Sequence, residues 1–285
     1  MMAYRPADRE LLKEVLAIPT QTYLECEMIA WLQRHFAQRG IATEVDKIGN
    51  LLAVKGDPGK PYPLVAAHTD SVHECRPITI IEDGERLIAH DRNGNQCGLG
   101  GDDKSGIFIC LELIDRFDHI KGAFFVSEEI GCVGSLNAPA RWFGDVGYAL
   151  QFDSPCDDIV TYTCNGMRLF PDEGEFAEIA LPLLEEFGCT NWQHHPYTDA
   201  MALKKRFDFV CMNLPAGYFN MHSSREYVVP EAVENSVQLG QALIGSLGTR
   251  HYAFKPEHSL GNPRHPVRGL ITHDWREPER QWREG

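Results

Sequence analysis

The segment Gly98–Gly106, with the sequence GLGGDDKSG, places two adjacent carboxylates between glycines and a Lys-Ser pair. A glycine-rich approach that ends in Lys-Ser is typical of a phosphate-binding loop. Such a loop needs glycine directly before the lysine, because backbone N–H groups surround the phosphate there. Asp103 occupies that position, and its carboxylate, like that of Asp102, would repel phosphate oxygens. The pattern therefore favours a cation site over a nucleotide site.

Other side chains able to bind a metal follow apolar runs that are typical of buried strands. They are His68 and Asp70 in PLVAAHTD, Glu128 and Glu129 in GAFFVSEE, Asp153 in YALQFD, and His222 in the loop sequence YFNMHSSRE. Each alone has an ordinary structural explanation, such as a helix cap or a solvated loop. In an open α/β sheet, however, strand ends meet at the ligand-binding edge, and acids gathered there need a compensating cation.

The types of these residues indicate which cation and which chemistry to expect. Two histidines with carboxylates and no cysteine suit zinc, cobalt or manganese better than calcium or magnesium, and their number fits two ions better than one. Residues two apart on a strand face the same side, so Asp70 can orient the ring of His68. Glu128 and Glu129 face opposite sides, so one can bind metal while the other acts as a general base.

Helices and strands must alternate to bring these residues together. Apolar positions at helical spacing predict helices over 7–18, 23–38, 105–117, 176–187, 199–206 and 231–247, and short apolar runs predict strands over 42–45, 51–54, 64–67, 78–81, 123–126, 148–152 and 207–212. The segment ITIIEDGERLIAH reads as one hairpin. The fold class is therefore α/β, with a mixed, mostly parallel sheet. We expect one domain over residues 1–251 and a Pro- and Gly-rich, charged tail over 252–285.

Composition and charge narrow the class of protein. The formal net charge of -14, from 27 basic and 41 acidic residues among 285, argues against nucleic acid as a partner. The N-terminal segment MMAYRPADRELLKEVL lacks the apolar core of a signal peptide, and no apolar run approaches the roughly 20 residues that span a bilayer. The nine cysteines include no CxxC pair. We therefore expect a cytoplasmic protein with no membrane partner.

Taken together, these motifs resemble those of the co-catalytic dinuclear-zinc exopeptidase clan, which includes zinc aminopeptidases, peptidase T-like tripeptidases, carboxypeptidases and N-acyl amino acid deacylases. The matching segments HTDSV, GGDDKSGI, VSEEIGCVGS, QFDSP and MHSSREYV occur in the order found in the clan. The resemblance covers about residues 64 to 230. It implies a three-layer αβα sandwich and a site with two divalent metal ions, zinc first, with cobalt or manganese as alternatives.

The resemblance also implies a role for each site residue. Asp102 would bridge the two metals, His68 and Asp153 would complete one ligand shell, and Glu129 and His222 the other. Asp70 would orient His68, and Glu128 would be the general base. The peptide bond between Asp102 and Asp103 is expected to be cis, as is common in the clan.

The implied activity is hydrolysis of amide bonds in small peptides, by an aminopeptidase or small peptidase. A deacylase or carboxypeptidase with the same dinuclear site is the alternative, and its substrate would be an acylated amino acid. Only about 70 residues separate Asp153 from His222, too few for the lid domain of many relatives. The oligomeric state is left open.

Several polar residues near these motifs have two readings. Asp199 is expected to start a helix with Thr198 rather than to bind a substrate amine. Glu226 either supports His222 or lies on the surface. The adjacent His194 and His195 are expected in a solvated loop rather than as accessory ligands.

Overall fold

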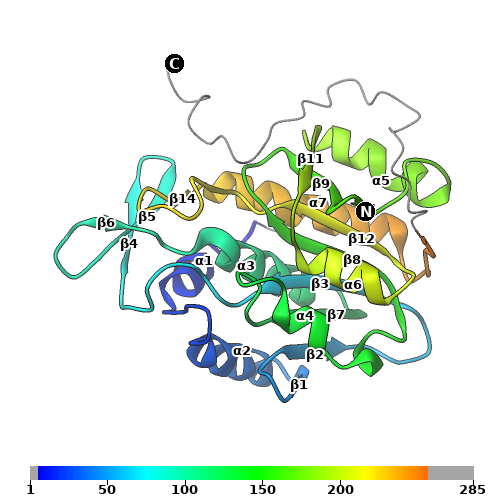
Figure 1. The fold of residues 1–285 in the computed structure, drawn as a ribbon, viewed down its shortest axis with the longest axis horizontal. Helices are drawn as coiled ribbons and strands as arrows, with labels where there is room; N and C mark the ends of the chain where they lie inside the picture. The colour runs from blue at the N-terminus through cyan, green and yellow to red at the C-terminus, as the bar shows by residue number, and fades with distance from the viewer. Residues whose placement is uncertain (1–5, 256–285) are drawn as a thin grey trace.

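The computed structural model describes residues 6–255, and their largest element is a nine-stranded sheet (Figure 1). The strand order is β1-β2-β7-β3-β8-β12-β9-β10, and β11 pairs with β9. These strands are β1 (Ala42–Val45), β2 (Leu51–Lys55), β3 (Tyr62–His68), β7 (Ile120–Phe125), β8 (Val146–Ser154), β9 (Ile159–Cys164), β10 (Met167–Arg168), β11 (Asn191–His195) and β12 (Val210–Pro215).

The centre of this sheet is parallel and its flanks are largely antiparallel. β3 pairs in parallel with β7 and β8, and β8 pairs in parallel with β12. β1, β2 and β7 are joined by antiparallel pairs, as are β9 and β12. All residues of β3 and β8 are buried, which explains their continuous apolar sequences, because a sheet covered on both faces has no polar side. The mixed α/β sheet expected from the sequence is confirmed.

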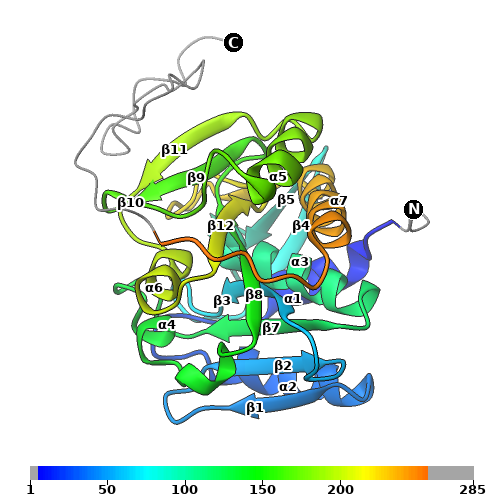
Figure 2. The same cartoon turned by 90° about the vertical axis from the view of Figure 1, so that its right-hand side faces the viewer.

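Helices cover both faces of the sheet. α3 (Gly101–Arg116) packs on β3, β7 and β8 and contacts α1 (Arg9–Ala17) and α7 (Pro230–Leu247). α6 (Asp199–Arg206) packs on β12 and β8 and contacts α4 (Val133–Asn137). Figure 2 shows α4 and α6 on the left and α3 and α7 on the right. The remaining helices are α2 (Cys26–Gln38), α5 (Glu175–Glu186) and the short 3-10 helix η1 (Ala140–Trp142).

Several elements differ from the sequence prediction. α2 begins at Cys26 rather than at Tyr23, because Tyr23 has a positive φ of 71° that no helix can contain. The strand expected over 207–212 is found over Val210–Pro215. β9 and β11 were not predicted, because their polar residues interrupt the apolar pattern.

A second, smaller sheet connects distant segments, in the order β13-β14-β5-β4 with β6 paired to β5. Its strands are β4 (Thr79–Asp83), β5 (Arg86–His90), β6 (Gln96–Cys97), β13 (Tyr218–Phe219) and β14 (Tyr227–Val228). The predicted hairpin is confirmed as β4 and β5. Its pairing with β14 was not foreseen, and the loop between β13 and β14 carries His222.

The last described residues pack against the rest of the fold. The N–H of Tyr252 donates to the carbonyl of Gly147 at 3.0 Å, and Ala253 forms an isolated bridge with Phe209. The predicted boundary at residue 252 therefore falls inside a packed stretch, and residues 256–285 of the predicted tail lie outside the described residues. Within residues 6–255, no helix is long and apolar enough to cross a membrane.

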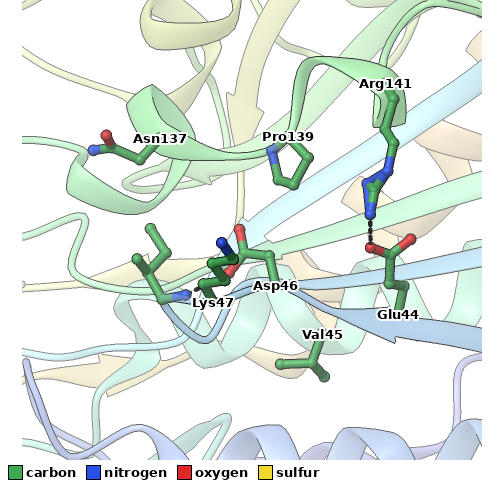
Figure 3. A pocket seen from close by; sticks show the side chains of 8 residues that line it. Glu44, Val45, Asp46, Lys47, Asn137, Pro139 and Arg141 are labelled. Atoms are coloured by element: carbon green, nitrogen blue, oxygen red, sulfur yellow. Dashed lines mark hydrogen bonds and ion pairs between the residues drawn. The ribbon is translucent and has the colours of Figure 1, made fainter.

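A surface pocket of about 290 Å³ lies between the turn after β1 and the α4–η1 segment (Figure 3). Its lining includes Val45, Asp46, Ile48 and the ion pair between Glu44 and Arg141. None of the residues predicted to bind metal lines this pocket.

Candidate metal centre

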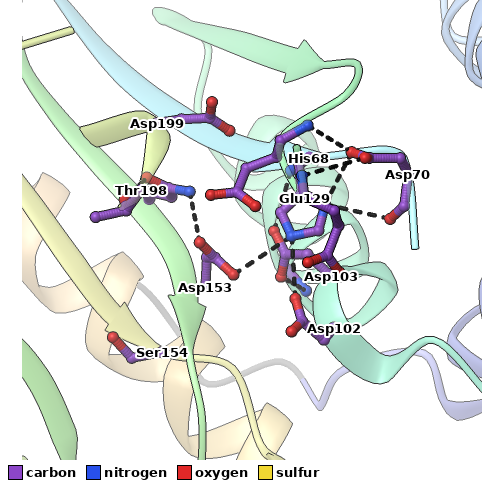
Figure 4. A network of polar contacts seen from close by, with 12 residues as sticks. His68, Asp70, Asp102, Asp103, Glu129, Asp153, Ser154, Thr198 and Asp199 are labelled. Atoms are coloured by element: carbon purple, nitrogen blue, oxygen red, sulfur yellow. Dashed lines mark hydrogen bonds and ion pairs between the residues drawn. The ribbon is translucent and has the colours of Figure 1, made fainter. Parts of the chain in front are cut away.

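The structure brings all five predicted metal ligands to one place. Figure 4 shows four of them: His68, Asp102, Glu129 and Asp153. His68 is the last residue of β3, and Asp153 is the penultimate residue of the neighbouring parallel strand β8. Asp102 lies at the start of α3, Glu129 in the loop after β7, and His222 in the loop after β13. Adjacent parallel strands end at the same edge of a sheet, so this convergence follows from the topology.

Asp102 is at the centre of the cluster. Its Oδ1 lies 3.0 Å from Nε2 of His68, and its Oδ2 lies 3.2 Å from Nε2 of His222. The same nitrogen of His68 is 3.5 Å from Oδ1 of Asp153, and that of His222 is 3.2 Å from Oε2 of Glu129. The two carboxylate oxygens of Asp102 therefore face two separate groups of ligand atoms.

Asp103 has a different environment from Asp102. The peptide bond between them is cis, as the resemblance implied. Asp103 accepts hydrogen bonds from the backbone N–H groups of His68 at 3.1 Å and Gly106 at 3.2 Å. Ligand atoms of His68, Asp103 and Asp153 also lie close enough together to hold an ion, as do those of His68, Asp102 and Glu129. Both aspartates thus lie at the centre, although Asp103 is already engaged by backbone donors.

Asp70 contacts both His68 and the loop that carries the glutamates. Its Oδ1 lies 3.4 Å from Nδ1 of His68 and accepts from the N–H of Glu128 at 2.8 Å. Its Oδ2 accepts from the N–H of Glu129 at 3.2 Å and from the hydroxyl of Thr22 at 2.9 Å. The predicted contact with His68 is present. The hydrogen bonds from the backbone of Glu128 and Glu129 to Asp70 were not predicted, because the partners are 58 and 59 positions apart in the chain.

The carboxylates of the centre affect one another's ionisation. Burial raises the pKa of Glu128 well above its usual value, and the negative charges of Asp153 and Asp199 add to this effect. Burial likewise raises the pKa of Asp153 to about 6. Burial also opposes ionisation of Asp102, but contacts with His222 and His68 hold its pKa below the ordinary value. The side chains of this centre therefore neutralise only part of the negative charge of these buried acids.

The histidines supply that partial compensation. Contacts with Asp102 and then Glu129 raise the pKa of His222 to about 10. Contacts with Asp102, Asp153 and Asp70 raise the pKa of the fully buried His68, although burial itself opposes this. The neighbouring carboxylates thus favour the positively charged form of both rings.

Glu226 binds the backbone of the loop before Asp102. This carboxylate is fully buried and accepts from the N–H groups of Leu99 at 3.0 Å, Gly100 at 2.7 Å and Asp102 at 3.2 Å. It also lies 2.9 Å from Nε2 of His73. Both sequence readings of Glu226 are wrong, because it neither supports His222 nor lies on the surface. No periodic pattern marks such a residue, since its partners are backbone groups about 125 positions away.

Lys104, which follows the two aspartates, holds the loop before them to the end of α1. Its ammonium group is buried and donates to the carbonyls of Leu16 and Leu99, each at 2.9 Å, and burial lowers its pKa to about 8.

Gly100 has a φ of 69°, which favours glycine, and a Cβ on Gly106 would lie 2.3 Å from Oδ1 of Asp103. The glycines of this segment thus allow a tight turn and close packing around the two aspartates.

The predicted helix start at Thr198 and Asp199 is found, with Thr198 accepting from the N–H of Ala200 at 3.1 Å. Asp199 is fully buried and accepts from the hydroxyl of Ser135 at 2.5 Å. Its Oδ2 has no hydrogen-bond partner among the described residues. Gln151 links this helix to the centre, because it donates to Asp153 at 2.9 Å and accepts from Thr198 at 2.6 Å.

His194 and His195 end β11 rather than lying in a loop. His194 is exposed, with Nδ1 2.9 Å from the hydroxyl of Thr163. His195 is half-buried, and the charges of Asp102 and His222 both affect its pKa, which burial lowers. The expectation of a loop is therefore wrong for both histidines, and His195 is close enough to Asp102 and His222 for their charges to affect it.

Comparison with known proteins supports the fold. No model of a known protein family matches the chain. A protein of Mycolicibacterium smegmatis, provisionally named a hydrolase, is 48% identical over 46 residues, which are 16% of this chain and 10% of that protein. The match thus spans about a tenth of that relative's length.

Solved structures match over most of the chain. Aminopeptidase PepT from Bacillus cereus has a TM-score of 0.70 at 16% identity, over 84% of this chain and 97% of that chain. A tripeptidase from Staphylococcus aureus has a TM-score of 0.68 at 13% identity, over 82% and 96%. An aminopeptidase from the archaeon Desulfurococcus kamchatkensis has a TM-score of 0.65 at 14% identity, over 84% and 94%. The chain therefore has the fold of these aminopeptidases and tripeptidases, as its resemblance to the dinuclear-zinc exopeptidases implied.

Proposed function

We propose that the chain is a metal-dependent hydrolase that cleaves amide bonds of small peptides, as an aminopeptidase or small peptidase. The observation that carries the proposal is the position of Asp102. Each of its carboxylate oxygens faces a different histidine, at 3.0 Å and 3.2 Å, which is the arrangement that a bridge between two metal ions requires. The three similar solved structures are two aminopeptidases and one tripeptidase, which supports peptides as the substrate class.

The residues present fit two divalent ions. His68 and Asp153 would hold one, Glu129 and His222 the other, and Asp102 both. The buried Oε1 of Glu129 has no hydrogen-bond partner among the described residues, and coordination would satisfy it. Imidazole and carboxylate donors without thiolate suit zinc first, with cobalt and manganese as alternatives.

Glu128 is the proposed general base. Two ions held there would supply Lewis-acid chemistry, which acidifies water and polarises a carbonyl. Glu128 would accept a proton from the attacking water as the water oxygen adds to the substrate carbonyl carbon. When the C–N bond breaks, Glu128 would return that proton to the leaving amine nitrogen. Asp70 holds the backbone of Glu128 at 2.8 Å and the ring of His68 at 3.4 Å, so it fixes the base relative to a ligand.

The proposed setting is the cytoplasm, and the proposed partner is a small peptide rather than nucleic acid or a membrane. All nine cysteines are free, although several are partly exposed, which is typical of a reducing compartment. The net charge of -14 disfavours nucleic acid.

The test is metal analysis combined with a substrate panel on one preparation. We expect about two ions per chain and hydrolysis of aminoacyl amides or dipeptides. Turnover of N-acyl amino acids alone, or removal of C-terminal residues alone, would replace the proposal with the deacylase or carboxypeptidase alternative. A loaded protein that hydrolyses no amide would reject enzyme function.

The role of Glu128 is tested by Glu128→Gln, which removes the base but keeps the shape of the side chain. We expect kcat to fall by about three orders of magnitude while metal content stays near two per chain. Glu186→Gln, an exposed position on α5, is the matched control and should retain full activity. Unchanged kcat in Glu128→Gln would reject this residue as the base.

A further inference from the structure

The loop Thr20–Glu25, which joins α1 to α2, turns its polar side chains inward and its apolar side chains outward. Thr20 and Glu25 are buried, with 4% and 7% exposed. Tyr23 and Leu24 are 76% and 51% exposed. This is the reverse of the usual distribution, in which large apolar side chains leave water.

The inward side chains fix this loop to residues that flank the metal centre. The hydroxyl of Thr20 donates to the carbonyl of Thr69 at 2.5 Å, and that of Thr22 donates to Asp70 at 2.9 Å. Glu25 accepts from the N–H of Ser127 at 3.1 Å. The loop is therefore held on one side by the segment of His68 and on the other by the segment that precedes Glu128.

Tyr23 also has a strained backbone, with a φ of 71°. This conformation is disfavoured for a bulky residue, and such strain is found mainly at functional sites. The side chain of Tyr23 makes no hydrogen bond or ring contact with any described residue. Nothing within residues 6–255 therefore accounts for an aromatic ring held in water at this position.

Two more exposed apolar side chains lie on segments that adjoin Asp70 in the chain or are bonded to its carboxylate. Val72, 42% exposed, follows Ser71, whose carbonyl accepts from the N–H of Thr22 at 3.2 Å. Ile130, 46% exposed, follows Glu129, whose N–H donates to Asp70 at 3.2 Å. Tyr23, Leu24, Val72 and Ile130 are named here the apolar rim, since each is within two residues of Asp70 or of a group bonded to it.

We propose that the apolar rim binds an apolar side chain of the peptide substrate, so that leucine- or phenylalanine-type residues next to the cleaved bond are favoured over charged ones. This inference rests on the proposed function. Exposed apolar groups that gather at one place mark binding surfaces, whereas scattered ones do not. Ile130 directly follows the predicted ligand Glu129, and Thr22 and Glu129 donate to the same oxygen of Asp70, so the rim adjoins the candidate metal centre. This position favours a substrate over a second copy of the chain as its occupant.

The first measurement compares substrates with the metal-loaded wild-type protein. We expect kcat/KM for leucyl and phenylalanyl substrates to exceed that for lysyl and glutamyl ones by about tenfold or more, since even one methylene group in an apolar pocket is worth about 10- to 200-fold. Hydrolysis of all these peptides at equal rates would overturn the inference while leaving the proposed function intact.

The second measurement removes the ring without disturbing the backbone. Glycine adopts positive φ freely, so Tyr23→Gly should keep the loop in place. We expect kcat/KM to fall by about tenfold for phenylalanyl and leucyl substrates and by less than about twofold for lysyl ones. Ile48→Asn, which removes another exposed apolar side chain from the pocket of Figure 3, is the control and should change neither value. An equal loss for every substrate would indicate a structural role and overturn the inference.

A binding measurement tests the affinity of the apolar rim for peptides without relying on hydrolysis. Calorimetry with metal-loaded Glu128→Gln protein should show that phenylalanyl dipeptides bind about tenfold more tightly than lysyl dipeptides, and that adding Tyr23→Gly removes the difference. Equal Kd values would overturn the inference even if no peptide is hydrolysed. A change from dimer to monomer on Tyr23→Gly, with substrate preference retained, would assign the rim to contact between subunits instead.

Discussion

Two groups of buried acids in this chain are neutralised in different ways. The structural acids are Glu226 and Glu112, and the centre acids are Asp102, Glu129 and Asp153. Glu226 accepts from three backbone N–H groups and lies 2.9 Å from His73. Glu112 pairs with Arg116 at 2.7 Å and accepts from the N–H of Asp8 at 3.2 Å.

The centre acids have fewer partners for their charge. Among the described residues, His68 and His222 are the only basic side chains that contact these three acids, and Oε1 of Glu129 has no hydrogen-bond partner there. A buried carboxylate is costly unless it is paired or coordinated. The difference indicates that protein groups complete the first cluster, whereas the second is completed by ions from outside.

The largest expected effect comes from neutralising an acid of the centre. Glu129→Gln should lower metal content from about two ions to about one and reduce kcat/KM by about three orders of magnitude, because a coordinating charge is lost. The free energy of unfolding of the metal-free protein should change by less than about 1 kcal/mol, because one oxygen of Glu129 has no partner to lose. Metal analysis, kinetics and urea titration in chelator measure these quantities. Full metal content in Glu129→Gln would contradict its role as a ligand.

The matched substitution in the structural acids, Glu226→Gln, should lower stability and leave metal binding intact. Glu226→Gln places an amide NH₂ group among backbone donors, so we expect the free energy of unfolding to fall by about 2–3 kcal/mol in chelator. Folded Glu226→Gln protein should still bind about two ions. Urea titration with and without metal measures the effect. If Glu226→Gln were as stable as wild type, the distinction between the two groups would fail.

Sequence patterns predict the centre better than its support. His68, Asp153 and Glu129 follow apolar strands, so the α/β topology alone brings them to one edge. Glu226 and Glu129 are the same residue type, and the sequence does not separate them, because the partners of Glu226 are backbone groups about 125 positions away. The contact of Asp70 with Glu128, and that of Thr22 with Asp70, likewise join residues far apart in the chain. Local patterns specify strands and helices, whereas these supports depend on how the elements pack.

The smallest expected effect is the pH dependence of the metal-free protein, and it separates the two groups without mutation. Burial raises the pKa of Asp153 to about 6 and that of Asp199 to about 7. Groups with a raised pKa in the folded state contribute stability that is complete below their unfolded pKa near 4 and is lost as pH rises through the folded value. His222 acts in the same direction, because its contribution is complete below pH 6.5 and is lost as pH rises toward about 10. The Tm in chelator should therefore fall between about pH 5 and pH 8.

Metal ions should reverse this trend, because they bind the deprotonated ligands and displace protons from His222 and His68. The Tm difference between zinc-loaded and chelated protein is expected to grow from pH 5 to pH 8, and calorimetric metal binding should release protons to the buffer. Scanning calorimetry at four pH values with zinc or with chelator measures both curves. A Tm in chelator that rises over this range, parallel to the curve with zinc, would show that the chain itself neutralises the centre acids, and the contrast with Glu226 would then have no electrostatic basis.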